Sequence, residues 1–154
     1  GGVFSVGVRG RRPPRATRRP YTTLVRSPLT GADLRRFEAG EIIYKNVCQA
    51  CHQPDGRGQD RTAPSLVGSN LALATPDVPI RILLSGKEGT IGLMPPLGAT
   101  MSDDQIASVL TYVRREWGQT GTPVDPVTVA DVRSRFATRT RPWTNNELLG
   151  VTLR

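Results

Sequence analysis

Both cysteines and the only histidine of this 154-residue chain lie within five consecutive positions, in the sequence VCQACHQPDG at residues 47–56. If this segment is helical, Cys48 and Cys51 are about one turn apart and project from the same face, while His52 points off at an adjacent angle. Sulfur and imidazole are side-chain groups that bind transition metals readily. The motif therefore predicts one chemical site, concentrated on a single helical turn.

Cys-x-x-Cys-His is the signature of covalent c-type haem attachment, in which two thiols bond to one haem edge and the imidazole binds the iron. Zinc is the main competitor, but a structural zinc site takes four protein ligands and this cluster offers three. A redox dithiol of the thioredoxin kind requires a preceding strand in a βαβ context, which the sequence does not show. A disulfide between the two cysteines would leave His52 unexplained. The motif favours one haem c, with the dithiol and the disulfide as alternatives.

The apolar pattern predicts helices and no strand. An amphipathic helix starts at the cap Asp33 and runs into the cysteine motif. A short helix starts near Asp77 and stops at Gly86, and adjacent prolines exclude helix from the loop that follows. The clearest helix starts at Ser102, which forms a capping box with the glutamine three residues later, and it stops at Gly118. The residues at helical spacing are Leu34, Phe37, Glu41 or Ile42, Tyr44 and Cys48 in the first helix, and Ile106, Val109, Leu110 and Val113 in the last.

Residues 119–154 add a segment with two shorter helix signals. Thr128 and Asp131 form one predicted cap pair, and Thr144 and Glu147 form another. We expect this segment to be a helical extension that packs on the preceding domain or on a partner. The residues expected to seal the far side of the core, or to contact a partner, are Trp143, Leu148 and Leu149.

The net charge of +8 comes from the two ends of the chain and not from its centre. Residues 1–32 carry seven arginines and no acidic residue, residues 33–132 are slightly acidic, and residues 133–154 are basic. The stretch RGRRPPRATRRP lacks apolar periodicity, so we expect residues 1–32 to be a disordered basic segment. Two other interpretations stand beside this one. The segment is a basic arm for nucleic acid or anionic membrane, or it is non-native, since RRPYTTLVRS resembles the translation of a common sequencing adapter.

Residues 33–118 resemble a class I cytochrome c. Gly40 and Tyr44, shortly before the cysteine motif, match the small residue and the aromatic residue by which the first helix of that family crosses its last. Val109 and Tyr112 in SVLTYV match their partners on the last helix. The resemblance implies an all-α fold with three to five helices packed around one covalently bound haem c, followed by the C-terminal extension.

The same resemblance implies the residues around the iron. Pro64, in RTAPSL, matches the proline whose carbonyl accepts a hydrogen bond from the iron-binding imidazole of His52. A thioether is the expected second axial ligand. Met94 lies in the proline-stiffened loop GLMPPLG, whereas Met101 precedes the cap Ser102 and is expected to pack as a hydrophobic staple. We therefore assign His52 and Met94 as metal ligands. The candidate haem-binding residues are Cys48, Cys51, His52, Pro64 and Met94, and the expected apolar lining is Leu66, Val67, Leu71, Ile82, Leu83, Leu93 and Leu97.

Two bound axial ligands leave iron no open position for a substrate, so the sequence predicts one-electron transfer and no catalysis at the metal. Together with MPPLGATMSDDQIASVLTYVRREWG at residues 94–118, the C-terminal extension resembles the haem domains at the end of bacterial quinoprotein sugar or alcohol dehydrogenases and of large multidomain haem proteins. That resemblance implies a redox partner, with a dehydrogenase as electron donor and a terminal oxidase or another cytochrome of the respiratory chain as acceptor. The alternatives are a haem enzyme or gas sensor with a displaceable sixth ligand, and nucleic-acid binding through the arginine-rich arm. We expect no nucleic-acid partner.

The sequence also bears on location. No apolar run reaches the roughly 18 to 20 residues of a membrane span. We see no secretory signal pattern, and the chain begins with Gly, so we expect a processed product or a fragment. In the proteins that this chain resembles, haem is attached on the outer side of the bacterial cytoplasmic membrane. We therefore expect a periplasmic protein whose export signal lies upstream of residue 1.

Overall fold

The computed structural model describes residues 1–2 and 28–152. The predicted disorder and the alternative of a nucleic-acid-binding arm concern residues 1–32, of which residues 3–27 lie outside the described part. The first helix begins at Gly31, ahead of the expected cap Asp33. Among the described residues, no helix combines the length and the apolar character needed to cross a membrane.

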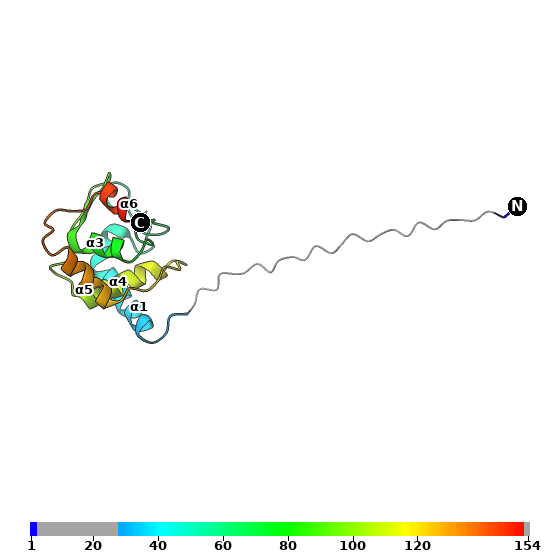
Figure 1. Cartoon of the computed structure of the whole chain (residues 1–154), viewed down its shortest axis with the longest axis horizontal. Helices are drawn as coiled ribbons and strands as arrows, with labels where there is room; N and C mark the ends of the chain where they lie inside the picture. The colour runs from blue at the N-terminus through cyan, green and yellow to red at the C-terminus, as the bar shows by residue number, and fades with distance from the viewer. Residues whose placement is uncertain (3–27, 153–154) are drawn as a thin grey trace.

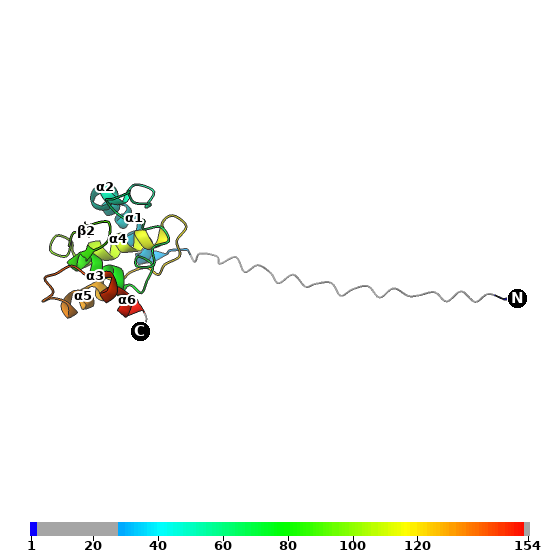
Figure 2. The ribbon, with the colours of Figure 1, turned by 90° about the horizontal axis from the view of Figure 1, so that it is seen from above.

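The described chain is mostly helical, as predicted. Figure 2 shows α4 in the middle of the molecule, with α2 on one side of it and α3, α5 and α6 on the other, and α1 packs directly against α4. The elements, in chain order, are α1 (Gly31–Ile43), the π-helix η1 (Tyr44–Cys48), α2 (Gln49–His52), α3 (Asp77–Ser85), β1 (Lys87–Glu88), β2 (Leu93–Met94), α4 (Asp103–Arg115), α5 (Pro126–Arg135) and α6 (Asn145–Thr152). Figure 1 labels the longer helices among them.

Two short strands were not predicted. In the antiparallel pair β1–β2, Lys87 lies opposite Met94 and Glu88 lies opposite Leu93. Strands of two residues are too short to show an alternating pattern in the sequence. The absence of strands that the sequence analysis predicted is therefore wrong at this hairpin, which carries one of the candidate site residues.

Gly40 lets α1 and α4 approach closely. A Cβ atom built on Gly40 would lie 2.6 Å from the carbonyl carbon of Ser108 and 2.8 Å from the Cβ atom of Tyr112. Further along the run, the ring of Tyr44 lies 5.3 Å from the ring of Tyr112, and Val109 is buried in the same apolar cluster. The crossing of these two helices that the resemblance implied is therefore confirmed.

The exposed residues of α1 differ from the prediction. Leu34 is 42% exposed and Ile42 is 63% exposed, whereas Ile43 packs against the core. The helix meets α4 through the narrow face that carries Phe37 and Tyr44. Ile42 lies two positions before Tyr44 and so points away from this face.

The helical run changes register just before the cysteine motif. Residues 44–48 form a π-helix, whose hydrogen bonds span one residue more than those of an α-helix. Tyr44, at its start, is buried against Tyr112 of α4, whereas Cys48 and His52 line a pocket. The prediction of one regular helix through the motif is wrong in this detail. The π-helix takes up the extra residue of this run between the two contacts.

The capping of α4 is confirmed. The Ser102 hydroxyl accepts a hydrogen bond from the Gln105 N–H at 3.2 Å, and the Gln105 side-chain oxygen accepts one from the Ser102 N–H at 2.9 Å. The helix ends at Arg115, ahead of the predicted stop at Gly118. Trp117 and Gly118 both have left-handed backbone, with φ of 50° and 77°, and this turns the chain away from the helix axis.

The predicted cap of α5 is wrong. Thr128 and Asp131 lie inside the helix, which begins at Pro126. The Asp125 carboxylate accepts a hydrogen bond from the Val127 N–H at 2.9 Å. Asp125 followed by proline is a stronger start signal than the predicted pair, because proline suits the first helical position and has no N–H to satisfy.

The segment around α6 packs on α3. Its cap is confirmed, since the Thr144 N–H donates to the Glu147 carboxylate at 2.9 Å and the Glu147 N–H donates to the Thr144 hydroxyl at 3.3 Å. Trp143 and Leu148 are buried in an apolar cluster with two residues of α3. Leu149 is 49% exposed, so it does not share the sealing role expected for all three residues.

A buried guanidinium ties the loops around α4 together. Arg114 is 2% exposed and donates to the carbonyl oxygens of Ala72 and Ala74, both at 2.7 Å, and to that of Thr122 at 2.8 Å. These bonds satisfy carbonyl groups that would otherwise be buried without a partner. The sequence analysis did not single out Arg114.

The close crossing at Gly40 can be tested by adding one methyl group. We expect Gly40→Ala to lower the free energy of unfolding by about 1–3 kcal/mol, because overpacking outweighs the gain in helix propensity of about 1 kcal/mol. Gly150→Ala in α6 is the matched control, since nothing lies within 4 Å of a Cβ atom there. Denaturant titrations followed by circular dichroism measure both variants. Equal effects of the two substitutions would contradict the crossing.

Candidate functional site

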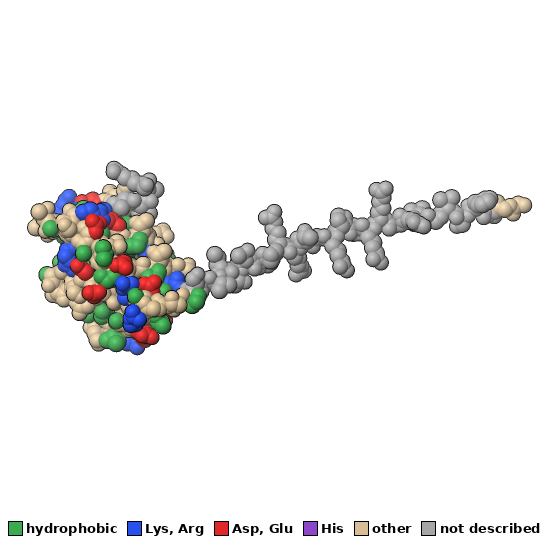
Figure 3. Space-filling view, turned by 60° about the horizontal axis from the view of Figure 1, so that its bottom comes forward, with side chains coloured by type: hydrophobic (Ala, Val, Ile, Leu, Met, Phe, Trp, Pro, Cys, Tyr) green, Lys and Arg blue, Asp and Glu red, His purple; other side chains and the backbone are tan. Residues whose placement is uncertain are grey.

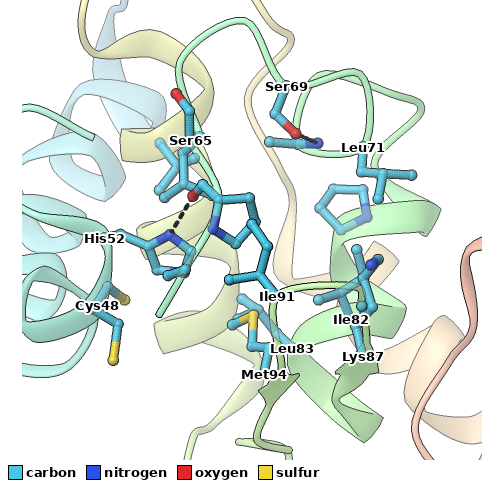
Figure 4. A pocket seen from close by; sticks show the side chains of 18 of the residues that line it. Cys48, His52, Ser65, Ser69, Leu71, Ile82, Leu83, Lys87, Ile91 and Met94 are labelled. Carbon is cyan, nitrogen blue, oxygen red and sulfur yellow. Dashed lines mark hydrogen bonds between the residues drawn. The ribbon is translucent and has the colours of Figure 1, made fainter. Parts of the chain in front are cut away.

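A cavity of about 410 Å³ lies between α2, α3, α4 and the loop that carries β2. Figure 4 shows its lining, with the cysteine motif on one wall and α3 on the other. The volume falls within the range of roughly 300–1,000 Å³ that is usual for cofactor and small-molecule sites. Apolar side chains from every wall dominate the lining, among them Leu66, Leu71, Ile82, Leu83, Val109 and Leu110. The cavity can therefore hold a mainly apolar group.

His52 ends α2 with its ring buried in this cavity. Its Nδ1 lies 3.1 Å from the carbonyl oxygen of Pro64, the contact drawn as a dashed line in Figure 4. Because a carbonyl oxygen can only accept, Nδ1 carries the proton and donates it, which leaves the lone pair on Nε2. Burial lowers the pKa of His52, although the bond to Pro64 acts in the opposite direction. The ring is therefore held as a neutral imidazole in the tautomer that binds metals through Nε2.

The loop after His52 is shaped to deliver the Pro64 carbonyl. Gly58 has φ of 74°, and a Cβ atom there would lie 2.7 Å from the Pro64 carbonyl oxygen. Gly56 has φ of 69°, and a Cβ atom there would lie 2.7 Å from the ring of Trp117. Both positions therefore require glycine, for conformation and for space. No pattern in the sequence marked these two tight approaches.

Cys48 and Cys51 also line the cavity, Cys48 half-buried and Cys51 exposed. Both are free cysteines, so the structure does not contain the disulfide alternative. Burial, with a smaller contribution from Cys51, raises the pKa of the Cys48 thiol to about 11. A catalytic dithiol depends on a lowered thiol pKa, so this environment does not favour redox exchange.

Met94 reaches the cavity from β2. Its side chain lies on the lining together with His52 and Cys48, as Figure 4 shows, and it packs against both apolar clusters of the protein. Met101 is 7% exposed, belongs to the core around α4 and is absent from the residues that line the cavity. The fold therefore brings all five predicted site residues to one cavity and leaves the second methionine in the core.

Most of the expected lining is present. Six of the seven apolar residues predicted to line the site do so, and Val67 is the exception. The lining also includes polar residues that were not predicted, among them Lys87 and Asn145. The Lys87 ammonium donates to the backbone carbonyl of Glu88 at 3.1 Å, and its partial burial lowers its pKa. No sequence motif marks these positions, since the tertiary packing of β1 and α6 alone brings them to the cavity.

The donor atoms around the cavity do not suit zinc. Within residues 1–2 and 28–152, no group of three or more His, Cys, Asp and Glu side chains is arranged to hold a metal ion. Structural zinc requires four such ligands at a closed tetrahedral site. One imidazole and one thioether on the lining of an apolar cavity, with two thiols at its edge, instead suit a prosthetic group that brings most of the metal's ligands itself.

Comparison with known proteins assigns the family. The sequence model described as cytochrome c oxidase, cbb3-type, subunit III matches residues 35–113. The chain is 32% identical over 116 residues, 68% of its length, to the fructose dehydrogenase cytochrome subunit of Gluconobacter japonicus, of which it covers 24%. It is 30% identical over 63% of its length to the gluconate 2-dehydrogenase cytochrome c subunit of Pantoea cypripedii, of which it covers 24%.

A third relative is the cytochrome c subunit of the quinone-type alcohol dehydrogenase of Gluconobacter oxydans (strain 621H), which is 28% identical over 52% of this chain, with 18% of the relative covered. The chain thus spans about a quarter or less of the length of these relatives. The matched region contains the crossing of α1 with α4 and every candidate site residue. The chain therefore belongs to this family of haem-binding c-type cytochrome domains, and its helices form the class I cytochrome c fold.

Proposed function

We propose that this chain is an electron-transfer module that holds one haem c, with His52 and Met94 as axial iron ligands. The observation that carries the proposal is the hydrogen bond of His52 Nδ1 to the Pro64 carbonyl, because it leaves Nε2 free to bind a metal inside an apolar cavity. Membership of the cytochrome c family supports the haem and the electron transfer. Family membership does not by itself identify the two axial ligands.

The residues of the cavity suit a covalently bound haem. Cys48 and Cys51 would each form a thioether with the porphyrin edge, and His52 Nε2 would bind the iron on one side. Met94 would bind it on the other side through its sulfur. When bound, the haem supplies a one-electron couple between ferric and ferrous iron. The chain contributes the orientation of the ring, the exclusion of water by apolar side chains and the choice of axial ligands.

The axial pair favours electron transfer over catalysis. A soft thioether ligand stabilises ferrous iron and raises the reduction potential, as does an apolar surrounding. With both axial positions filled by the protein, a substrate has no position to bind. We therefore propose that the chain is not itself an enzyme. A haem enzyme or gas sensor would require Met94 to be displaced readily.

The relatives suggest the kind of partner. Each is named as a cytochrome subunit of a sugar, sugar acid or alcohol dehydrogenase. We propose that this chain accepts electrons from a dehydrogenase partner or domain and passes them to an acceptor of the respiratory chain, in the periplasm of a bacterium. On the face of the molecule shown in Figure 3, acidic and basic side chains are interspersed. A mixed surface of this kind suits transient contact with a protein better than contact with nucleic acid.

Covalent attachment is tested by removing the thiols. We expect Cys48→Ala and Cys51→Ala each to retain haem through one thioether, and the double variant to lose its haem to acid–acetone extraction. Mass spectrometry of the purified proteins gives the mass added by bound haem. Haem that stays covalently attached in the double variant would show that the attachment site lies elsewhere.

The sixth ligand is tested by a matched pair of methionine variants. Leucine conserves volume, so the packing cost of Met94→Leu and of Met101→Leu should each be less than about 1.5 kcal/mol. We expect Met94→Leu to lose the low-spin spectrum, to bind carbon monoxide in the ferrous form and to lower the potential by on the order of 0.1 V, given the roughly 0.8 V over which axial ligands tune haem. Met101→Leu should change none of these. The opposite result would assign the ligand to Met101.

A further inference from the structure

The C-terminal segment contacts the loop that carries Met94 at two places, one at each end of the loop. We name residues 86–101 the Met94 loop, and from here the extension means residues 126–152, the part of the C-terminal segment that contains α5 and α6. We propose that the extension is a clamp that positions the Met94 thioether at the iron and so resists its displacement by small ligands. This inference rests on the proposed function, because it requires Met94 to be an axial ligand.

The first contact lies where the Met94 loop begins. The Trp143 N–H donates to the Gly86 carbonyl at 3.0 Å, and the Glu88 N–H donates to the Trp143 carbonyl at 2.9 Å. Trp143 thereby pairs in parallel with Lys87 of β1. Lys87 also pairs with Met94 of β2, in the antiparallel hairpin. Strand β1 thus lies between the extension and the proposed ligand, and the backbone of the extension limits how far the hairpin can move.

Side-chain packing reinforces this contact. Trp143 is 5% exposed in an apolar cluster against which Met94 packs. Its ring meets the ring of Phe136 edge-on at 5.1 Å, and the Arg139 guanidinium lies 3.4 Å from its centroid. The indole N–H of Trp143 is buried without a hydrogen-bond partner among the described residues. The indole is therefore held by packing and ring contacts, so another aromatic ring should be able to replace it.

The second contact lies where the Met94 loop ends. The Arg133 guanidinium of α5 donates to the carbonyl oxygens of Gly98 and Met101, the latter at 2.9 Å. The same guanidinium is paired with the Asp103 carboxylate at 2.8 Å. Three partners fix the planar group in one orientation. The extension therefore anchors the chain on both sides of Met94, through an aromatic ring on one side and a guanidinium on the other.

Two fixed ends favour the iron-bound position of Met94. A ligand on an anchored loop competes with a free ligand at a high effective concentration, and releasing one end of the loop lowers that concentration. Imidazole in solution is a suitable competitor, because it binds ferric haem when the sixth position opens. The clamp therefore predicts that loosening the extension tightens imidazole binding, even though neither Trp143 nor Arg133 is among the residues that line the cavity.

The test uses the full haem-loaded chain and compares four variants. We expect Trp143→Ala to bind imidazole at least about tenfold more tightly than the unmodified protein, equivalent to about 1.4 kcal/mol. Trp143→Phe should restore the affinity to within about threefold. Ile106→Val is the control, because Ile106 is fully buried in α4, outside the extension and outside the lining of the cavity. It should lower the free energy of unfolding and leave imidazole affinity unchanged. Met94→Leu gives the imidazole affinity that is expected when the proposed ligand is absent.

The outcomes separate the clamp from the axial assignment. If Met94→Leu tightens imidazole binding and Trp143→Ala does not, the clamp is wrong and the axial pair stands. If Met94→Leu also leaves the affinity unchanged, the axial assignment is wrong and the clamp fails with it. An equal effect of Ile106→Val would mean that general destabilisation is responsible, and this too overturns the clamp. If Trp143→Ala does not fold, Arg133→Gln tests the other end of the loop, with tighter imidazole binding expected.

Discussion

The close contact between α1 and α4 fixes the position of the cysteine motif and its imidazole. Gly40 allows the two helices to touch at the backbone of Ser108, and Tyr44 then packs on Tyr112. The Tyr44 hydroxyl donates to the Gln53 carbonyl at 2.6 Å, so the same crossing also holds the residue that follows the cysteine motif. The imidazole of the site is thus placed between two anchored points of one helical run.

The aromatic cluster at this crossing extends to the loop that orients the imidazole. The ring of Trp117 contacts Tyr44 edge-on with centroids 5.4 Å apart, and the Trp117 indole N–H donates to the Pro54 carbonyl at 3.3 Å. The loop that begins with Pro54 continues to Pro64, whose carbonyl fixes the imidazole tautomer. A few aromatic rings, well placed, thereby serve helix packing and ligand orientation together. This double role matters in a chain with only eight aromatic residues besides its histidine.

Local signals in the sequence predicted local features well. The capping boxes at Ser102 and Thr144 were identified because a cap and its partner are three residues apart and need no tertiary context. Cys48, Cys51 and His52 were identified as candidates because the spacing of the motif is specific, whereas Pro64 and Met94 were identified through the resemblance to class I cytochromes c. The start of α5 was missed although Asp125 followed by proline signals it in the sequence.

Features created by tertiary packing could not be predicted in this way. The two-residue strand β2, which holds Met94, forms because β1 pairs with it and is itself hydrogen-bonded to the backbone of Trp143. Lys87 reaches the cavity for the same reason. The exposure of Ile42 beside the partly buried Ile43 depends on the angle at which α1 meets α4, and a periodic pattern does not fix that angle.

The π-helix between Tyr44 and Cys48 bears on how many residues can separate the aromatic anchor from the cysteine motif. Each residue of an α-helix turns the chain by about 100°. The π-helix takes up one extra residue within its turn, so a regular α-helix with the same number of residues would rotate the cysteines and the imidazole by about that angle relative to the aromatic anchor. Deleting one residue within the segment would instead restore the regular helix and leave its two ends in phase. This turn is therefore a place where the number of residues between the anchor and the motif can change by one while the site keeps its orientation.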